Sequence, residues 1–192
     1  MADWPRVKWS EASQVLDLLG DAGAADLPKA DGVLPAAYFE QLRGAGRLAD
    51  ATQFLGHALP RLEAVAWAAR TVRDLPPADG KADRADELAL RATLFWIGDP
   101  TENRRYAAYN AAMACRVGSA ERLAALAAFF SGGSIAPAEL APVHAPKEAS
   151  NRFAAGAVML AAGRTADMTG ALAKALDAGV IIANRGLEPA AA

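Results

Sequence analysis

Residues Phe54–Arg70 read FLGHALPRLEAVAWAAR, and this stretch decides the fold of the chain. It predicts the end of one helix, a corner at Pro60 and the start of a second helix, because proline fits the first turn of a helix but not its interior. The second helix, which should reach residue 75, carries an apolar stripe formed by Leu62, Val65, Ala66, Ala69 and Val72. Trp67 points about 140° away from Leu62 at 100° per residue. Apolar groups on two sides predict that this helix is central or carries an interface.

Proline and glycine divide the rest of the chain into further helices. Together with the one that Pro60 opens, the expected helices cover residues 35–43, 48–58, 60–75, 82–97, 100–117, 120–130, 147–162 and 166–183. The helix over 82–97 has apolar side chains on two sides and should be well buried. One face of the helix over 100–117 is formed by Tyr106, Tyr109, Met113 and Val117.

The sequence therefore predicts an all-α fold of about eight antiparallel helices. About a quarter of the residues are alanine, which favours helix and lets helices approach closely, whereas β-branched residues are few. Two arrangements remain open, a bundle and a short HEAT-like stack of helical hairpins. The stack is suggested by a weak repeat, because Phe54 precedes Pro60 much as Phe95 precedes Pro100, at an offset of about 40 residues. The same succession of helix, corner and helix also occurs in any antiparallel bundle.

Composition divides the chain into three parts. Residues 1–34 contain Trp4 and Trp9 in a polar opening, a short helix over 10–19 and a linker rich in Gly, Pro and Asp. We interpret them as an arm whose tryptophans dock on the domain, with a tethered recognition segment as the alternative. Residues 35–184 form a single helical domain, and residues 185–192 form a flexible tail.

Charge and hydropathy indicate a cytoplasmic protein. The formal net charge of −2 gives no general attraction to nucleic acid or to anionic lipid. Cys115 is the only cysteine, so no intrachain disulfide can form, which fits a reducing compartment. The start of the chain lacks the pattern of a secretory signal. The longest apolar run, Phe153–Gly163, is about half of what a membrane span needs, so we expect no membrane insertion and no nucleic-acid partner.

The residue patterns of common catalytic and metal sites are missing from the sequence. His57 is interpreted as a helix-end residue whose ring bonds backbone carbonyls, and neither it nor His144 has a partner at metal-ligand spacing. Cys115 lies near a helix C-terminus, so an inert thiol is expected. The segment 131–134 (SGGS) follows a helix C-terminus, unlike a phosphate loop, and is interpreted as a stop that directs the crossover after it. We expect no cofactor, no metal and no enzymatic activity.

Tryptophan and arginine supply the candidate interaction residues, because both are enriched at interface hot spots. Trp67 shares one flank of its helix with Arg70, and two arginines lie at a helix start, where the dipole disfavours cations. The candidates are Trp4, Trp9, Trp67, Arg70, Arg104 and Arg105. The alternative is that Trp67 fills a second core layer and that the arginines are solvated or pair with Asp99 and Glu102.

Three blocks of the sequence resemble an uncharacterised bacterial family. They are Phe54–Arg70, Trp96–Tyr109 (WIGDPTENRRYAAY) and Phe129–Pro137 (FFSGGSIAP). The resemblance covers residues 35–165, and Phe130 stands where a tryptophan is common in the family. Its members are small, Ala-rich helical proteins of proteobacteria that are often encoded near type VI secretion genes. The resemblance implies an all-α fold and an accessory role around a secretion machine or its cargo, and it supplies no catalytic residue.

These observations favour a non-catalytic helical module that binds a protein partner, such as an adaptor, a chaperone or a regulator. A second hypothesis is an immunity-like inhibitor of a toxic effector, for which a strongly charged complementary face is expected. A third is an enzyme or a small-molecule binder that uses His57 in a pocket lined by helices.

Overall fold

The computed structural model describes residues 3–77, 80, 83–137 and 139–187. Within these residues all regular structure is α-helical, which confirms the predicted fold class. The helices are α1 (Ala12–Ala24), α2 (Pro35–Gly44), α3 (Leu48–Ala58), α4 (Arg61–Asp74), α5 (Arg84–Gly98), α6 (Glu102–Ala114), α7 (Ala120–Phe129), α8 (Ala149–Gly163) and α9 (Met168–Arg185). The eight helices expected after residue 34 correspond to α2–α9. None of the described helices is both long enough and apolar enough to cross a membrane.

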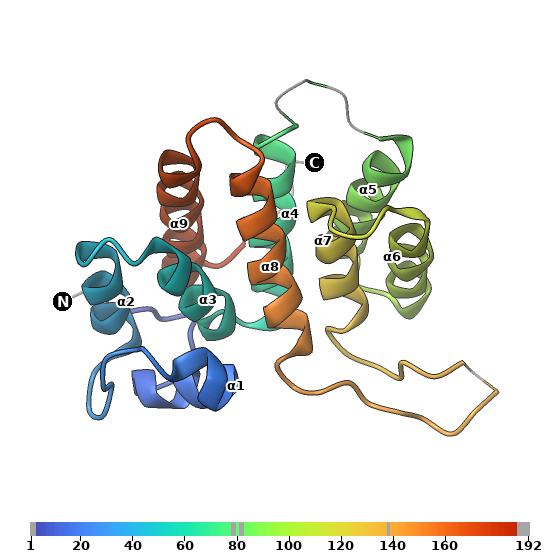
Figure 1. Cartoon of the computed structure of the whole chain (residues 1–192). Coiled ribbons are helices and arrows are strands. Elements are labelled where there is room, and N and C mark those ends of the chain that lie inside the picture. Colours follow the sequence, from blue (N-terminus) through green and yellow to red (C-terminus); the bar gives the residue numbers. More distant parts are fainter. Residues whose placement is uncertain (1–2, 78–79, 81–82, 138, 188–192) are drawn as a thin grey trace.

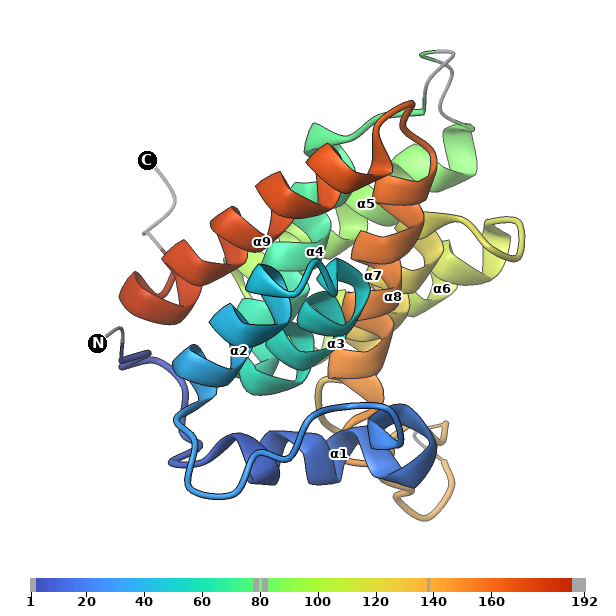
Figure 2. The same cartoon turned by 60° about the vertical axis from the view of Figure 1, so that its left-hand side comes forward.

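Helices α4 and α8 lie at the centre of the molecule (Figure 1). Helices α2, α3 and α9 lie on one side of them, and α5, α6 and α7 lie on the other. α4 packs against α5, α7, α8 and α9, while α8 packs against α3, α4, α7 and α9. α1 lies across one end of the bundle, against α2 and α3 (Figure 2). Of the two positions predicted for the helix after Pro60, the central one is therefore confirmed.

The helix contacts favour the bundle over the HEAT-like stack. In a stack of repeats each unit contacts only its neighbours along the chain. Here α3 and α4 pack against α8 and α9, which follow about 90 to 120 residues later in the sequence. The side chain of Asn151 at the start of α8 donates to the carbonyl oxygens of Gly56 and Leu59, at 2.6 and 2.8 Å. The end of α3 and the corner at Pro60 are thus bonded directly to a distant helix.

Two glycines let helices approach closely around α4. A Cβ atom on Gly56 would lie 2.8 Å from the Cβ of Ala155, which is closer than real Cβ atoms come. A Cβ on Gly179 would lie 2.5 Å from Leu55 Cδ2 and 2.9 Å from Trp67 Nε1. The absence of a side chain at these positions therefore allows α3 to meet α8 and α9 to meet α4.

Helix α5 is less buried than the sequence predicts. Leu88 and Phe95 are 51% and 54% exposed. The buried stripe is formed instead by Asp86, Ala89, Thr93 and Trp96. The hydroxyl of Thr93 donates to the Ala89 carbonyl at 2.8 Å, so this polar side chain is satisfied inside the helix. The prediction was wrong because α5 and α6 form the outer pair of the bundle and the inward face includes polar residues.

Helix α6 buries a face that contains two of its alanines, and it ends earlier than the sequence predicts. Arg105, Ala108 and Ala112 are buried, whereas Met113 is 42% exposed and Val117 is 88% exposed. The helix stops at Ala114, and Cys115 takes an extended conformation. A short turn through Gly118, at a φ of 91°, then leads into α7. Helix packing here follows the small residues Ala108 and Ala112, which allow a close approach, rather than the larger apolar side chains.

The N-terminal segment packs on the rest of the chain. Trp4 is 4% exposed, and its ring centroid lies 5.1 Å from that of Phe39 on α2. The backbone N–H of Arg6 donates to the Ala183 carbonyl of α9 at 3.1 Å. The Tyr38 hydroxyl donates to the Pro28 carbonyl at 2.7 Å. Residues 3–34 thus extend the core of the bundle, while most of the expected tail, residues 188–192, lies outside the described part of the chain.

Candidate functional site

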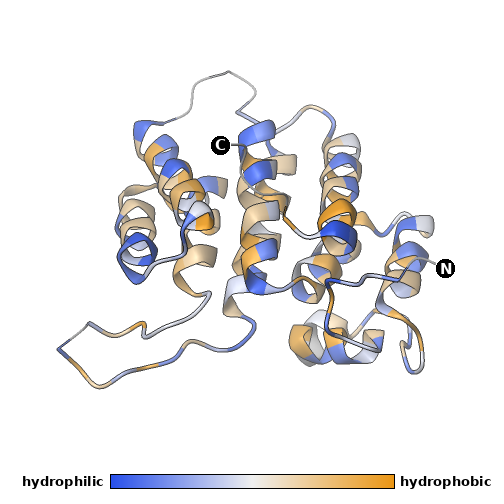
Figure 3. Cartoon of the chain, turned by 180° about the vertical axis from the view of Figure 1, so that it is seen from behind, coloured by the Kyte–Doolittle hydropathy of each residue, from blue (hydrophilic) through white to orange (hydrophobic). Residues whose placement is uncertain are grey.

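The connection between α7 and α8, residues 131–148, is the most prominent irregular part of the molecule, and we refer to it as the crossover. It projects from the helical body (Figures 1 and 3), and its described residues contain no helix or strand. Apolar and polar residues are mixed along it (Figure 3). Leu140 is 63% exposed and Val143 is 51% exposed. The crossover therefore presents apolar side chains to solvent away from the core.

Arg61 holds both ends of the crossover. This residue opens α4 directly after Pro60. Its Nη1 donates to the Ser131 carbonyl at 2.9 Å, and its Nη2 donates to the Lys147 carbonyl at 3.2 Å. One guanidinium group thus reaches the first and the penultimate residue of the crossover. This role could not be predicted from the sequence, because Arg61 has the pattern of an ordinary exposed residue at a helix start.

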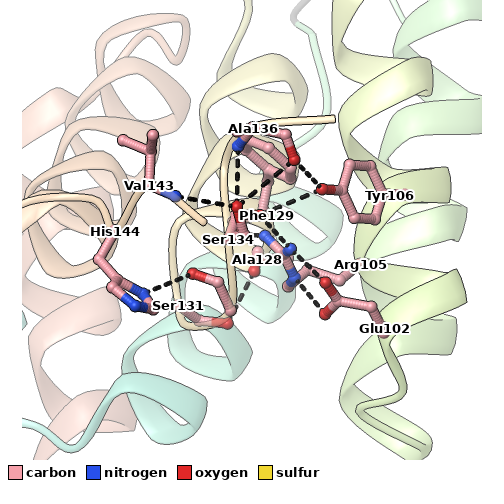
Figure 4. Close-up of polar contacts among 11 residues, drawn as sticks. Glu102, Arg105, Tyr106, Ala128, Phe129, Ser131, Ser134, Ala136, Val143 and His144 are labelled. Carbon is pink, nitrogen blue, oxygen red and sulfur yellow. Dashed lines mark hydrogen bonds and ion pairs between the residues drawn. The ribbon is translucent and has the colours of Figure 1, made fainter. Parts of the chain in front are cut away.

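Arg105 holds the base of the crossover from the other side (Figure 4). Its side chain is 4% exposed and pairs with Glu102 through Nε and Nη2, at 2.8 and 2.6 Å. Nη1 donates to the Phe129 carbonyl at 2.5 Å, and Nη2 also donates to the Ser134 carbonyl at 2.6 Å. The hydrogen bond from Arg105 lowers the pKa of Glu102 and raises that of Arg105, so the pair is ionised. Arg105 therefore joins the end of α7 to the start of the crossover.

Ser134 links the two limbs of the crossover (Figure 4). Its Oγ accepts from the backbone N–H groups of Ala136 and Val143, each at 3.1 Å. The N–H of Ile135 donates to the Val143 carbonyl at 2.8 Å. The Tyr106 hydroxyl lies 3.1 Å from the Ser134 carbonyl and 2.9 Å from that of Ala136, to either of which it can donate. The crossover is therefore fixed at its base and exposed at its tip.

The segment SGGS follows the end of α7, as predicted. Helix α7 ends at Phe129 with Phe130 as its C-cap, and Gly133, three residues beyond the cap, has a φ of 68°, the left-handed conformation expected of one of the two glycines. A Cβ atom on Gly133 would also lie 2.9 Å from Arg105 Nη2. Glycine is therefore required here both for its backbone conformation and for the close approach of the Arg105 guanidinium.

Three of the six predicted interaction residues, Trp4, Trp67 and Arg105, are internal rather than part of an exposed binding face. Trp67 is fully buried, and its Nε1 donates to the Ala175 carbonyl at 2.7 Å, because α9 covers the second side of α4. Arg105 is 3% exposed, because its donors are used by Glu102 and by the carbonyls described above. The alternative reading, in which Trp67 fills a second core layer and an arginine pairs with Glu102, describes both residues correctly.

The remaining candidates lie apart from one another. Trp4 is buried in the core, and Trp9 is half-buried with the Lys8 ammonium 4.3 Å from its ring centroid. Arg104 donates to the Phe95 carbonyl at 2.8 Å, so it serves the C-terminus of α5 rather than opposing the dipole of its own helix. Arg70 is half-buried beside the groove between α4 and α9. The six candidates therefore do not form one face.

His57 and Cys115 are both buried inside the helical body. His57 is 2% exposed, and its Nδ1 lies 2.8 Å from the Gln53 carbonyl, so it bonds a backbone carbonyl as predicted. Burial lowers the pKa of the His57 ring, which favours its neutral form. Burial and the neighbouring Asp86 raise the pKa of the Cys115 thiol to about 12, which makes a thiolate nucleophile unfavourable. In the described part of the chain, no three His, Cys, Asp or Glu side chains are placed to hold a metal ion.

Comparison with known proteins gives one family. Residues 38–183 match a family of unknown function (DUF6931), whereas no curated protein and no solved structure matches the chain. The matched region runs from α2 into α9 and contains the Pro60 corner, Arg105 and the whole crossover. It covers more than half of the chain and agrees with the expected resemblance to an uncharacterised family. The chain belongs to this family of unknown function.

Proposed function

We propose that the protein is a non-catalytic protein-interaction module whose binding element is the crossover. Long connections without regular structure are uncommon in compact domains and are often functional. The crossover combines a fixed base with exposed apolar side chains, Leu140 between its two limbs and Val143 where the limbs are hydrogen-bonded. A segment that is ordered before binding loses less conformational entropy on binding, which favours affinity.

The proposal rests mainly on the two hydrogen bonds that the Arg61 guanidinium donates to the crossover. Because one guanidinium reaches the carbonyls of Ser131 and Lys147, the ends of α7 and α8 are already close together. Helix–helix connections of this kind usually need about 2–8 residues. The fold therefore does not need residues 132–146 to bridge the gap, and their length and their exposed apolar tip favour a role outside the fold.

The partner is proposed to be a protein with an apolar docking surface. The exposed side chains of Leu140 and Val143 suit an apolar surface on such a partner. An accessory role near a type VI secretion system in proteobacteria, as adaptor, chaperone or regulator, is part of the proposal and rests on the resemblance of the three sequence blocks. The secretion machinery and its effectors are therefore the first partners to test.

A shortened chain tests this proposal. In this variant an Asn-Gly turn replaces residues 136–142, because Ile135 and Val143 are already hydrogen-bonded across the two limbs and a two-residue turn suits that pairing. The helical circular dichroism should be unchanged, and Tm should stay within about 4 °C, equivalent to about 1 kcal/mol for a chain of this size. Affinity purification from the native host, read by mass spectrometry, should recover a defined partner with the full chain and lose it with the shortened chain.

Circular dichroism and Tm report on the fold, whereas affinity purification reports on partner binding. A shortened chain that folds and still recovers the same partner would contradict the proposal. A shortened chain that loses its helical signal would show that the fold needs the crossover and would remove the observation on which the proposal rests.

A further inference from the structure

A groove of about 520 Å³ lies between α4 and α9. This volume is within the range of small-molecule sites, about 300–1,000 Å³. On the α9 side, Ala175 and Ile182 are nearly buried, whereas Ala178 is exposed and Ile181 is 52% exposed. Helix α9 therefore gives the groove an apolar wall that solvent and ligands can reach.

Two cationic residues also line this groove, Arg70 on α4 and Lys174 on α9. The two helices run antiparallel, since Arg164, just before α9, donates to the Leu75 carbonyl at the end of α4. Lys174 directly precedes the residue whose carbonyl accepts from Trp67, and Arg70 is one turn beyond Trp67. Both positive charges therefore lie at about the same level of the groove.

The apolar part of the groove continues from these charges along α9. Ala178 follows Lys174 by one turn, and Ile181 follows it by two. Residues at this spacing lie on one face of a helix. The groove therefore places a positive end next to an apolar stretch.

Arg70 has hydrogen-bond donors that the protein does not use. In the described part of the chain the half-buried arginines are Arg43, Arg47, Arg70, Arg104, Arg122 and Arg164. All of them except Arg70 donate to a carboxylate or to a backbone carbonyl. Among the described residues, the side chains of Arg70 and Lys174 make no hydrogen bond or ion pair. Asp74, which also lines the groove, pairs with Arg73 at 2.8 Å, so it does not neutralise them.

We propose that this groove binds a small amphipathic carboxylate, with its negative head group on Arg70 and Lys174. The planar guanidinium matches a carboxylate through two parallel N–H···O bonds. The apolar chain of the ligand lies along Ala178 and Ile181, where its removal from water favours binding. The groove is separate from the crossover, and this inference does not depend on the proposed function.

Calorimetric titration of the full chain with octanoate, at fixed ionic strength, tests the site. Butyrate has the same head group and a shorter chain, whereas 1-octanol and octylammonium have the same chain without the negative charge. Octanoate should bind about tenfold or more tightly than each of them. Equal binding of butyrate would indicate a simple anion site, and equal binding of octylammonium would indicate a purely apolar one. Either result would overturn the proposal.

Variants locate the binding in the groove. Arg70→Met keeps an apolar side chain, so it should weaken octanoate binding about tenfold or more and leave 1-octanol binding unchanged. Arg185→Met is the matched control, because Arg185 is exposed on α9 and does not line the groove. It should leave octanoate binding unchanged. Ala178→Phe fills the groove from an exposed position and should weaken octanoate and 1-octanol binding alike.

Two groups of the protein itself could compete for the groove. Glu188, which lies outside the described residues, is a carboxylate that follows Gly186 of the groove, so each titration is repeated in Glu188→Gln. Sedimentation equilibrium of the same samples measures pairing with a second copy. Octanoate binding seen only in Glu188→Gln, or a dimer that Ala178→Phe dissociates, would overturn the proposal.

The absence of octanoate binding in both backgrounds would also overturn it, and so would binding that Arg70→Met leaves intact. If Ala178→Phe fails to fold by circular dichroism, the Arg70 variant and the uncharged probe still decide the outcome.

Discussion

The indole nitrogen of Trp67 donates to the carbonyl oxygen of Ala175 at 2.7 Å, which binds the middle of α4 to α9. Trp67 is fully buried, and Gly179 on the next turn of α9 leaves room for its ring. The apolar groups on two sides of the helix after Pro60 therefore belong to two layers of one core. This contact also explains why a tryptophan with the sequence pattern of a hot spot is internal.

Trp67→Phe should lower the free energy of unfolding by about 1–3 kcal/mol, because it removes a buried hydrogen bond and part of the buried ring. Urea denaturation followed by circular dichroism measures the change. Trp9→Phe is the matched control, since Trp9 is half-buried, and it should change stability by less than about 0.5 kcal/mol. Equal effects at the two positions would show that the Trp67 contact contributes little.

Gly179→Ala should destabilise the fold by about 1–3 kcal/mol despite the higher helix propensity of alanine, because the new Cβ would meet Leu55 and Trp67. Gly44→Ala is the control, since a Cβ there meets nothing within 4 Å. The control should be neutral or slightly stabilising. A Gly179→Ala variant as stable as wild type would mean that α4 and α9 are not as close as described.

Arg105→Met should lower the free energy of unfolding by about 2–4 kcal/mol, because it leaves the Phe129 and Ser134 carbonyls without their donor. Hydrogen exchange in the crossover should also become faster. Arg104→Met is the matched control, because the Arg104 side chain is 43% exposed. It should lower the free energy of unfolding by less than about 1 kcal/mol. Unchanged exchange in the Arg105 variant would show that other contacts suffice to order the crossover.

Stability should fall as the pH drops through the ordinary pKa range of histidine, near 6.5. Burial lowers the pKa of His57 in the folded state, so the unfolded state binds a proton at a higher pH than the folded state does. The stability that comes from the lowered pKa of His57 is thus fully present above pH 6.5, and it is lost as the pH falls below that value. Urea denaturation between pH 7.5 and 5.5 should show this slope in wild type and in His144→Gln. His57→Gln should reduce it, and an unchanged slope would contradict the assignment.

Much of the fold could be predicted from local sequence signals. Pro35, Pro60 and the Asp99–Glu102 segment mark helix starts, and the SGGS segment directly follows the end of α7, because these effects depend on residues next to one another. The inward face of α5 could not be predicted in the same way. Asp86 and Thr93 are internal there because α4, α6 and α7 pack against α5.

The candidate site was predicted only in part. The sequence located the crossover and the SGGS segment before it. The contacts of Arg61 with Ser131 and Lys147 could not be inferred, because they join residues about 70 and 86 positions apart.

The most direct test of the central claim is the affinity of the purified partner for two matched variants. Leu140→Ser with Val143→Ser alters the tip of the crossover, and Leu88→Ser with Phe95→Ser alters similarly exposed side chains on α5. The account predicts that the crossover variant raises the Kd about tenfold or more, a loss of about 1.4 kcal/mol or more, while the α5 variant binds like wild type. An unchanged Kd for the crossover variant, or a loss confined to the α5 variant, would contradict it.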